Sequence, residues 1–422
     1  MAAPARLPRR LGLAEAVVIG AGSMVGAGVF VAWSPAAAAA GTGLLLGLAL
    51  AAVVASCNAA SSAQLAAAHP ESGGTYVFAR HRLGPAWGHL AGWGFVVGKT
   101  ASCVAIALAV GAYLWPERER WLAMALVVGV AVVNVGGLRR TAAVTVALLA
   151  VAVTSLAIVV VSGWTVPDTS LARLLPIDGD LFGIIRSGGF LFFAFAGYAR
   201  IATLGEEVRD PERTIPRAIP IALGAVLVLY AVVGVTALTA VPVAALATTD
   251  APLRLVVEAG GLDSLAPVTT VGAAIASAGV LLNLLPGISR TVLAMARRDE
   301  LPRWFAHVDA RRQLPLRAEL SVVAIVIVLL VAADLRSAIA LSGVTVLSYY
   351  AITNAAALRL GPDERRWPRP LAVVGLIGCV LLVAGLPPRA IVVGALTMLT
   401  GVLVRLVIGR RPTFTAPSPD GC

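Results

Sequence analysis

The chain has 422 residues, of which 59% are hydrophobic and only 13% are charged. Soluble domains carry about 25% charged residues, so this composition excludes a soluble protein, and it leaves too little polar sequence for a soluble domain beside a single anchor. The net charge of +11 comes almost entirely from arginines in short connections, which indicates membrane topology rather than nucleic-acid binding.

Proline, glycine and charged residues divide the sequence into twelve apolar segments, and a membrane-spanning helix needs only ~20 such residues. The segments cover residues 11–33, 43–67, 86–114, 121–138, 142–163, 182–204, 217–241, 267–296, 318–333, 337–358, 371–386 and 389–408. They are continuous rather than alternating, which excludes a strand barrel. We therefore expect an all-α membrane protein with one transmembrane domain, 1–422, whose Pro-rich end at 409–422 is a disordered tail.

The distribution of arginine predicts the orientation of this domain. If the N-terminus is cytoplasmic, the connections on that side hold 22 basic residues and the opposite side holds 7. The seven are Arg118, Arg120, Arg173, Arg186, Arg254, Arg336 and Arg389. Because basic residues are retained on the cytoplasmic side, both termini are predicted to be cytoplasmic and the chain to be a multi-pass protein of the cytoplasmic (cell) membrane.

Metal, disulfide and cofactor sites are not expected. Cys57, Cys103, Cys379 and Cys422 share no metal-type spacing and give no disulfide framework. The four histidines lie in or near predicted cytoplasmic connections without ligand spacing, and no phosphate-binding loop or nucleophile motif is present. We therefore predict no cofactor, no enzymatic activity and no ATP-driven step by this chain alone.

Two of the twelve segments are interrupted by glycine-rich stretches. The first has glycine at positions 20, 22, 26 and 28, and the sixth contains FFAFAGY at 192–198. Glycine weakens a helix by roughly 1 kcal/mol per position and lets backbone amides approach a ligand, although small residues also serve close helix packing. The interruptions lie five segments apart and therefore in opposite membrane orientation, a pattern that indicates a transporter binding site in an inverted repeat.

Four stretches resemble motifs of the amino acid–polyamine–organocation superfamily of permeases. They are GSMVGAGVF (22–30), PESGGTYVFAR (70–80), FAFAGY (193–198) with GEEVRDPERTIPR (205–217), and SR (289–290) with AMARRDELPR (294–303). Each alone is a weak match, but together they occur in the family's order and on the expected membrane side. The resemblance covers about residues 11–408, and the sixth-segment stretch is most similar to the cationic amino acid transporter branch.

The resemblance implies twelve helices in a five-plus-five inverted repeat, with helices 1 and 6 discontinuous. The halves would be 11–164 and 182–358, and two appended helices would occupy 371–408. An amino acid would bind near the midplane between the two interrupted helices.

The resemblance also implies which groups would hold that amino acid. Its carboxylate would meet backbone amides at Ala27 and Gly28, and its ammonium would meet carbonyls of Met24, Phe193 and Ala196. Interrupted helices leave such N–H and C=O groups unpaired, so a zwitterion fits them on physical grounds as well. A side chain at Gly26 or Gly28 is expected to crowd the carboxylate. Phe193, Phe195 and Tyr198 are the aromatic residues expected to line the cavity.

Lys99 is the only lysine of the chain and lies halfway along the third segment. A charge at the membrane centre costs roughly 2.5–3.5 kcal/mol on insertion scales, so such residues are commonly functional. Burial disfavours the charged form of lysine, which makes its protonation sensitive to its neighbours. Two functional interpretations stay open, a proton-coupling group or a fixed charge that replaces a sodium ion. The structural alternative is a lysine that snorkels or packs against carbonyls.

Further charged residues lie near the cytoplasmic end of the sixth segment. Arg200 follows the interruption and could pair with Glu15 or with Glu206 and Glu207 as a gate, although a static surface ion pair is an equal alternative and contributes little.

These features predict a secondary active amino acid transporter, most consistent with proton symport and alternating access. An amino acid or polyamine exchanger and a non-transporting amino acid sensor stay open as alternatives. The expected partners are the amino acid, protons as the coupling ion and the lipid bilayer, with neither nucleic acid nor an obligate protein partner.

Overall fold

The computed structural model describes residues 11–69, 73–136, 142–167, 169–198, 201, 208–309, 312 and 314–408. Within these ranges the chain is helical and forms no named strand. The first half holds α1 (Leu13–Met24), α2 (Ala27–Val31), α3 (Trp33–Ala40), α4 (Leu44–Ala68), α5 (Thr75–Leu83), α6 (Pro85–Leu114), α7 (Glu119–Val135) and α8 (Ala142–Thr165). The second holds α9 (Leu181–Phe195), α11 (Pro211–Ala240), α12 (Val243–Thr248), α13 (Pro252–Ala259), α14 (Ala266–Arg297), α15 (Leu316–Ala332), α16 (Leu335–Ala357), α17 (Arg369–Gly385) and α18 (Pro388–Ile408).

Each of the twelve predicted segments contains a helix at nearly the predicted position. Among the described residues, eight helical stretches are long and apolar enough to cross a membrane, and α9 and α17 are shorter apolar helices. An all-helical, multi-span fold is therefore confirmed, whereas the count of twelve spans, the inverted repeat and the side of the termini stay predictions. The predicted tail at 409–422 lies outside the described residues.

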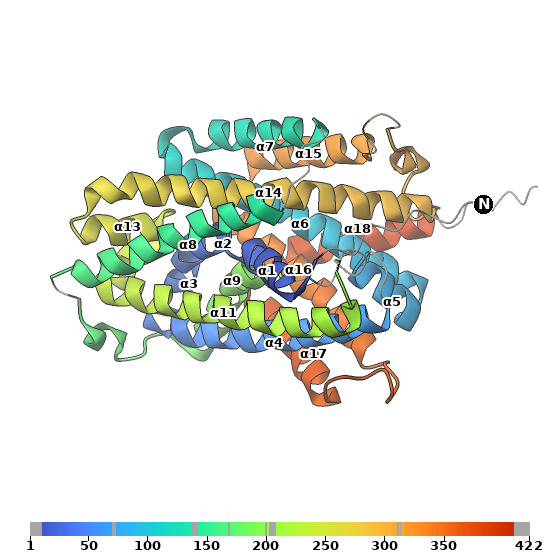
Figure 1. Cartoon of the computed structure of the whole chain (residues 1–422), viewed down its shortest axis with the longest axis horizontal. Helices are drawn as coiled ribbons and strands as arrows, with labels where there is room; N and C mark the ends of the chain where they lie inside the picture. The colour runs from blue at the N-terminus through green and yellow to red at the C-terminus, as the bar shows by residue number, and fades with distance from the viewer. Residues whose placement is uncertain are drawn as a thin grey trace, which may run out of the picture.

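The long helices run side by side along the long axis of the molecule, and α1 and α9 lie in its middle (Figure 1). The third predicted span, α6, packs against both α14 and α16 and is the most buried of the long helices. By contrast, α18 is largely exposed. A buried α6 explains how a lysine at its centre can be kept away from lipid.

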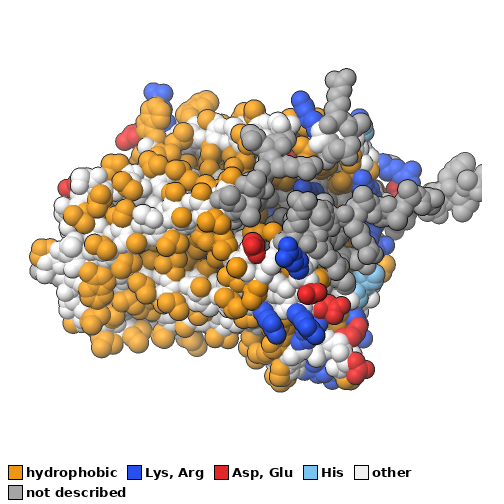
Figure 2. All heavy atoms as spheres, viewed as in Figure 1, with side chains coloured by type: hydrophobic (Ala, Val, Ile, Leu, Met, Phe, Trp, Pro, Cys, Tyr) orange, Lys and Arg blue, Asp and Glu red, His pale blue; other side chains and the backbone are white. Residues whose placement is uncertain are grey.

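Charged side chains gather at one end of the molecule, near α5 and the connections that the sequence assigns to the cytoplasm. In Figure 2 most of the remaining visible surface is covered by hydrophobic side chains. Large exposed apolar residues of the molecule include Val132, Val328, Ile377 and Val407. An apolar belt beside a charged end is the surface expected of a membrane-embedded bundle.

Candidate functional site

The first predicted interruption is a real break between α1 and α2. Helix α1 ends at Met24, and the next two residues leave helical geometry: Val25 has ψ near 86° and Gly26 is extended. Helix α2 then begins at Ala27. Since the first N–H groups of a helix and the last C=O groups have no partner within it, the break exposes both kinds of group.

The second break follows α9, which ends at Phe195. Residues 196–198 form a turn in which the N–H groups of Ala196 and Tyr198 donate to the carbonyls of Phe193 and Phe195. Gly197 in this turn touches the end of α1, because a Cβ at Gly197 would lie 2.1 Å from the carbonyl oxygen of Ser23. The two breaks are thus in direct contact.

A cavity of about 350 Å³ lies beside both breaks and is lined by residues of α1, α2, α4, α5, α6, α9, α14 and α16. This volume falls within the range of small-molecule sites, roughly 300–1,000 Å³. Its polar lining residues include Ser23, Ser62, Thr75, Lys99, Ser102, Asn283, Arg290 and Thr291, and its apolar ones include Phe95, Ile106, Phe193, Val280, Leu284 and Tyr349. No aspartate or glutamate belongs to the described lining.

Six of the eight expected substrate-binding residues line this cavity: Met24, Gly26, Ala27, Gly28, Phe193 and Ala196. The expectation that Phe195 and Tyr198 also line it is corrected by the structure, because both are fully buried behind the break. Phe195 packs on Tyr230, and Tyr198 stacks on Tyr350. These two aromatic side chains therefore hold the turn by packing against other buried rings and do not face the cavity.

Gly28 is close to another helix, which changes the reason for requiring glycine there. A Cβ at Gly28 would lie 2.6 Å from the Cα of Ala194 in α9, and one at Gly26 would lie 2.5 Å from the side chain of Val280. A side chain at either glycine would therefore clash within the protein itself, and crowding of a substrate carboxylate stays a prediction. Close packing, one of the two explanations that the sequence left open, applies to Gly28.

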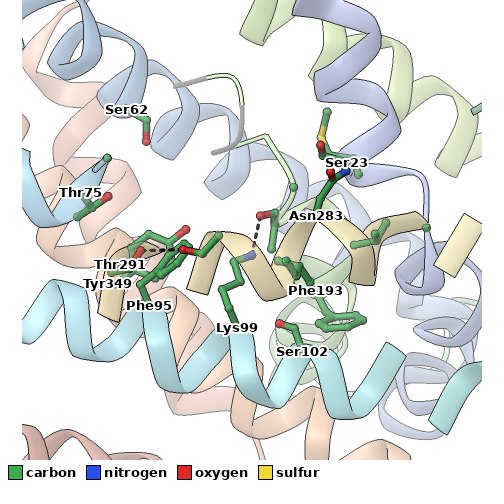
Figure 3. A pocket seen from close by; sticks show the side chains of 18 of the residues that line it. Ser23, Ser62, Thr75, Phe95, Lys99, Ser102, Phe193, Asn283, Thr291 and Tyr349 are labelled. Atoms are coloured by element: carbon green, nitrogen blue, oxygen red, sulfur yellow. Dashed lines mark hydrogen bonds between the residues drawn. The ribbon is translucent and has the colours of Figure 1, made fainter. Parts of the chain in front are cut away.

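Lys99 points from α6 to the second break. Its side chain is only 6% exposed, and its Nζ donates a hydrogen bond of 3.0 Å to the carbonyl oxygen of Ala196 (Figure 3). Ala196 is the C-cap of α9, where free carbonyls attract a cation. An ammonium has three donors, and the described residues supply one acceptor, so Lys99 keeps donors for the cavity that it lines.

The three carbonyls expected for the substrate ammonium already accept hydrogen bonds within the protein. Ala196 accepts from Lys99, Met24 accepts from the hydroxyl of Tyr230, and Phe193 accepts from the N–H of its own turn. Each carbonyl oxygen has a second lone pair, so these bonds leave one acceptor site on each.

The remaining gating residues are placed as follows. Glu15 is exposed at the start of α1, where its carboxylate accepts a hydrogen bond of 3.0 Å from the N–H of Gly12. This is the helix-capping contact expected of a glutamate in a first turn, and it lies at the end of α1 away from the break. Arg200, Glu206 and Glu207 lie outside the described residues.

The amino acid permease family matches the chain over residues 11–408. The chain belongs to this family. It is 54% identical to an uncharacterized transporter of Mycobacterium tuberculosis, over 98% of this chain and 94% of that protein. It is 23% identical to a branched-chain amino acid permease of Bacillus subtilis, over 96% and 94% of the two chains. It is 28% identical to a vacuolar cationic amino acid transporter of Arabidopsis thaliana, over 76% of this chain and 58% of that protein.

These matches confirm the resemblance that the four motifs carried. With the helical bundle, they make the chain a permease, that is, a multi-pass membrane transporter and not an enzyme. The relatives differ in the substrates that their names give, so the family alone does not select one amino acid.

Two polar residues of this permease were missed by sequence reasoning. Tyr230 of α11 reaches both breaks, with its hydroxyl 2.9 Å from the oxygen of Met24 and 3.1 Å from that of Ala194. Asn283 of α14 also lines the cavity (Figure 3). Both are polar residues inside long apolar segments, a signal that could have marked them as candidates.

Tyr113, near the end of α6, makes a buried contact with the segment that follows the first break. Its hydroxyl donates a hydrogen bond of 2.7 Å to the carbonyl of Phe30 in α2 and accepts one of 3.3 Å from the N–H of Leu253 in α13. Its ring meets that of Phe30 edge-on at 6.0 Å between centroids. These contacts join the segment after the first break to α6 and α13.

Near α5, the buried carboxylate of Glu300 joins three segments of the permease. It forms an ion pair with Arg80 of α5, and Arg405 of α18 and the ring of His89 in α6 lie 3.7 and 3.8 Å from its oxygens. Burial alone would raise the pKa of Glu300, but the neighbouring His89, Tyr76 and Arg80 lower it below its ordinary value. The carboxylate is therefore charged at neutral pH.

Proposed function

We propose that this permease is a secondary active transporter that moves amino acids across the cytoplasmic membrane by proton-coupled symport with alternating access. The observation that carries the proposal is the hydrogen bond from buried Lys99 to Ala196 at the second break. A protonated lysine is attracted by the carbonyl end of α9, whereas a neutral amine is attracted much less. Protonation of Lys99 would therefore strengthen its contact with the carbonyl of Ala196 at the second break, and deprotonation would weaken that contact.

In this proposal the substrate binds as a zwitterion between the breaks. The free N–H groups of Ala27 and Gly28 receive its carboxylate, with Gly26 giving them access. The second lone pairs of Met24, Phe193 and Ala196 receive its ammonium. Support comes from the geometry of the breaks and from the cavity that touches all six residues.

We further propose that the substrate side chain is neutral and apolar. The described lining carries the basic residues Lys99 and Arg290 but no carboxylate that could pair with a cationic side chain. Phe95, Ile106 and Leu284 instead offer apolar surface. This charge pattern argues against a cationic substrate, even though the sixth-segment motif resembles the cationic branch.

Alternating access is supported by the unequal ends of the cavity. The cavity extends from the breaks to Thr75 of α5 and to Arg290 and Ala294 of α14, toward the predicted cytoplasmic end. At the other end, Tyr113 and Phe30 are fully buried and joined. We infer an inward-facing arrangement, from which the opposite state requires the contact between Tyr113 and Phe30 to open. Arg200, Glu206 and Glu207 are retained in the proposal as cytoplasmic gating residues, whereas Glu15 fixes the start of α1.

Uptake by the full chain in reconstituted vesicles tests the proposal. A panel of radiolabelled neutral, acidic and cationic amino acids is supplied outside, with and without an inside-alkaline pH gradient. We expect accumulation of neutral apolar amino acids that a protonophore abolishes. Exchange of internal for external substrate that ignores the pH gradient would contradict symport but leave transport intact, and preference for cationic amino acids would overturn the proposed substrate class.

A further inference from the structure

A second cavity, of about 430 Å³, shares no lining residue with the substrate cavity and lies beside the first residues of α16 and α18. It is lined by residues of α3, α6, α9, α16 and α18 and by the end of α15. Three of its lining residues are arginines: Arg186, Arg336 and Arg389. We call it the arginine-rimmed cavity.

The three arginines lie within the first two turns of three helices. Arg186 lies in the second turn of α9, and Arg336 and Arg389 are the second residues of α16 and α18. Four or five residues further along each helix, an apolar residue lines the same cavity: Phe190, Leu341 and Val393. Since a helix rises 1.5 Å per residue, each helix passes from a charged rim to an apolar wall within ~6–8 Å.

No described acidic side chain forms an ion pair with any of these arginines. Arg186 donates through Nε to the carbonyl of Gly385, and Arg336 donates to Ser34 and to the carbonyl of Ala247. Arg389 is exposed, and no described side chain pairs with it. A guanidinium has five N–H donors, so all three keep donors for a ligand.

The acidic residues nearest to the arginines along these helices cap the helices and do not pair with the arginines. Asp180 and Asp334 are the N-caps of α9 and α16, where their carboxylates accept from the N–H groups of Gly183 and Ser337. The arginines around the cavity are thus left without a described acidic partner, although the guanidinium of Arg186 also lies 4.9 Å from the centroid of the Phe182 ring.

This arrangement is electrostatically unfavourable without an anion. Cations are disfavoured at helix N-termini, and Arg336 and Arg389 lie in first turns. Basic residues are also disfavoured on the side of a membrane opposite the cytoplasm, yet three of the seven arginines predicted there line this one cavity. An anion between the arginines would relieve their repulsion.

We propose that the arginine-rimmed cavity binds an anionic phospholipid, with the phosphate of its headgroup between the arginines and the start of an acyl chain along the apolar wall. A free anion would account for the three arginines at the rim of the cavity, but not for the apolar residues that line the rest of it. The wall continues to Ala101 and Val104 of α6, thirteen and ten residues before its end at Leu114, a depth of ~15–20 Å along that helix. An anionic headgroup attached to a hydrocarbon chain matches both parts.

The arginine-rimmed cavity is bordered by helices that adjoin the two breaks. Pro35, Ala38 and Ala39 of α3 contact the cavity, and so does Phe190 of α9. A bound lipid would therefore contact the helices that adjoin both breaks.

Lipid binding by the purified full chain tests the proposal. Phosphatidylglycerol, phosphatidylcholine with the same acyl chains, and inorganic phosphate are titrated in detergent and followed by native mass spectrometry and thermal shift. The main variant is R389Q, because Arg389 is exposed and its loss leaves the helix contacts intact. The matched control is R118Q, which removes an exposed arginine from the same predicted side outside the cavity.

We expect tighter binding of phosphatidylglycerol than of phosphatidylcholine. One arginine near an anionic headgroup contributes about fivefold to affinity, so R389Q should weaken phosphatidylglycerol binding by that factor and R118Q should leave it unchanged. Adding R186Q should weaken it further. Equal binding of both lipids, or an unchanged affinity in R389Q, would overturn the proposal. Full competition by millimolar inorganic phosphate would assign the rim to a free anion instead of a lipid.

Discussion

The hydroxyl of Tyr230 donates a hydrogen bond of 2.9 Å to the carbonyl oxygen of Met24, the last residue of α1. The same hydroxyl lies 3.1 Å from the carbonyl oxygen of Ala194 in α9. A single side chain of α11 therefore reaches the carbonyl ends of both interrupted helices. Carbonyl groups at a helix end need partners when buried, and Tyr230 supplies one.

Replacing Tyr230 by phenylalanine should destabilise the breaks. The substitution keeps the ring on Phe195 but removes the donor, so we expect a loss of about 1–2 kcal/mol in stability and a higher KM for uptake. Thermal unfolding in detergent and uptake kinetics measure the two effects. Y350F is the matched control, because the hydroxyl of Tyr350 is also buried but, unlike that of Tyr230, reaches neither Met24 nor Ala194. Equal effects of both variants would contradict a specific role for Tyr230.

A methyl group at Gly28 should separate the two interrupted helices. The added Cβ would meet the backbone of Ala194 at 2.6 Å, and backbone cannot move aside as a flexible side chain can. We expect G28A to lower the apparent unfolding temperature and to abolish uptake. G224A is the control, since nothing lies within 4 Å of a Cβ at Gly224 in α11, and alanine there should stabilise the helix by up to about 1 kcal/mol. Normal uptake by G28A would contradict this prediction, because it would show that α2 and α9 can separate enough to accommodate the methyl group.

Sequence patterns predicted the positions of the long helices and both breaks, because hydropathy and glycine spacing are local properties. They also marked Lys99 by its depth in an apolar segment. They did not predict that Lys99 bonds to Ala196, 97 positions away, since that contact depends on how α6 and α9 pack. The same reason explains why Phe195 and Tyr198 were expected in the cavity: the sequence places them beside the break, but only the packed bundle decides which side of the turn they face.

Removing the charge of Glu300 should loosen the end of the bundle near α5. Glu300 is 6% exposed and pairs with Arg80, so E300Q should cost roughly 2 kcal/mol at pH 7. Asp299, its neighbour, pairs only with Arg303 among the described residues, and both are exposed, so D299N should have little effect. Thermal unfolding of the purified protein compares the two variants.

The cost of E300Q should depend on pH. The folded-state pKa of Glu300 is lowered, so its contribution is present above the ordinary glutamate pKa near 4.3 and is lost as the pH falls through the lower folded-state value. The difference between wild type and E300Q should therefore be largest at neutral pH and shrink below about pH 4. A difference that grows in acid would mean that the folded-state pKa of Glu300 is raised instead of lowered.

Lys99 gives the most direct test of coupling. If its proton links substrate movement to the pH gradient, its charge must differ between the two access states, because a group with equal charge in both biases neither. K99M should then keep exchange of substrate across the membrane but lose accumulation by at least about tenfold, equivalent to ~1.4 kcal/mol of coupling. K99R should fail in the same way, since arginine effectively does not deprotonate. The control is T100V, because Thr100 is buried next to Lys99 and bonds within its own helix to Val96. Full pH-driven accumulation by K99R or K99M would make Lys99 a packing residue and move the search to Glu319, which is buried in α15.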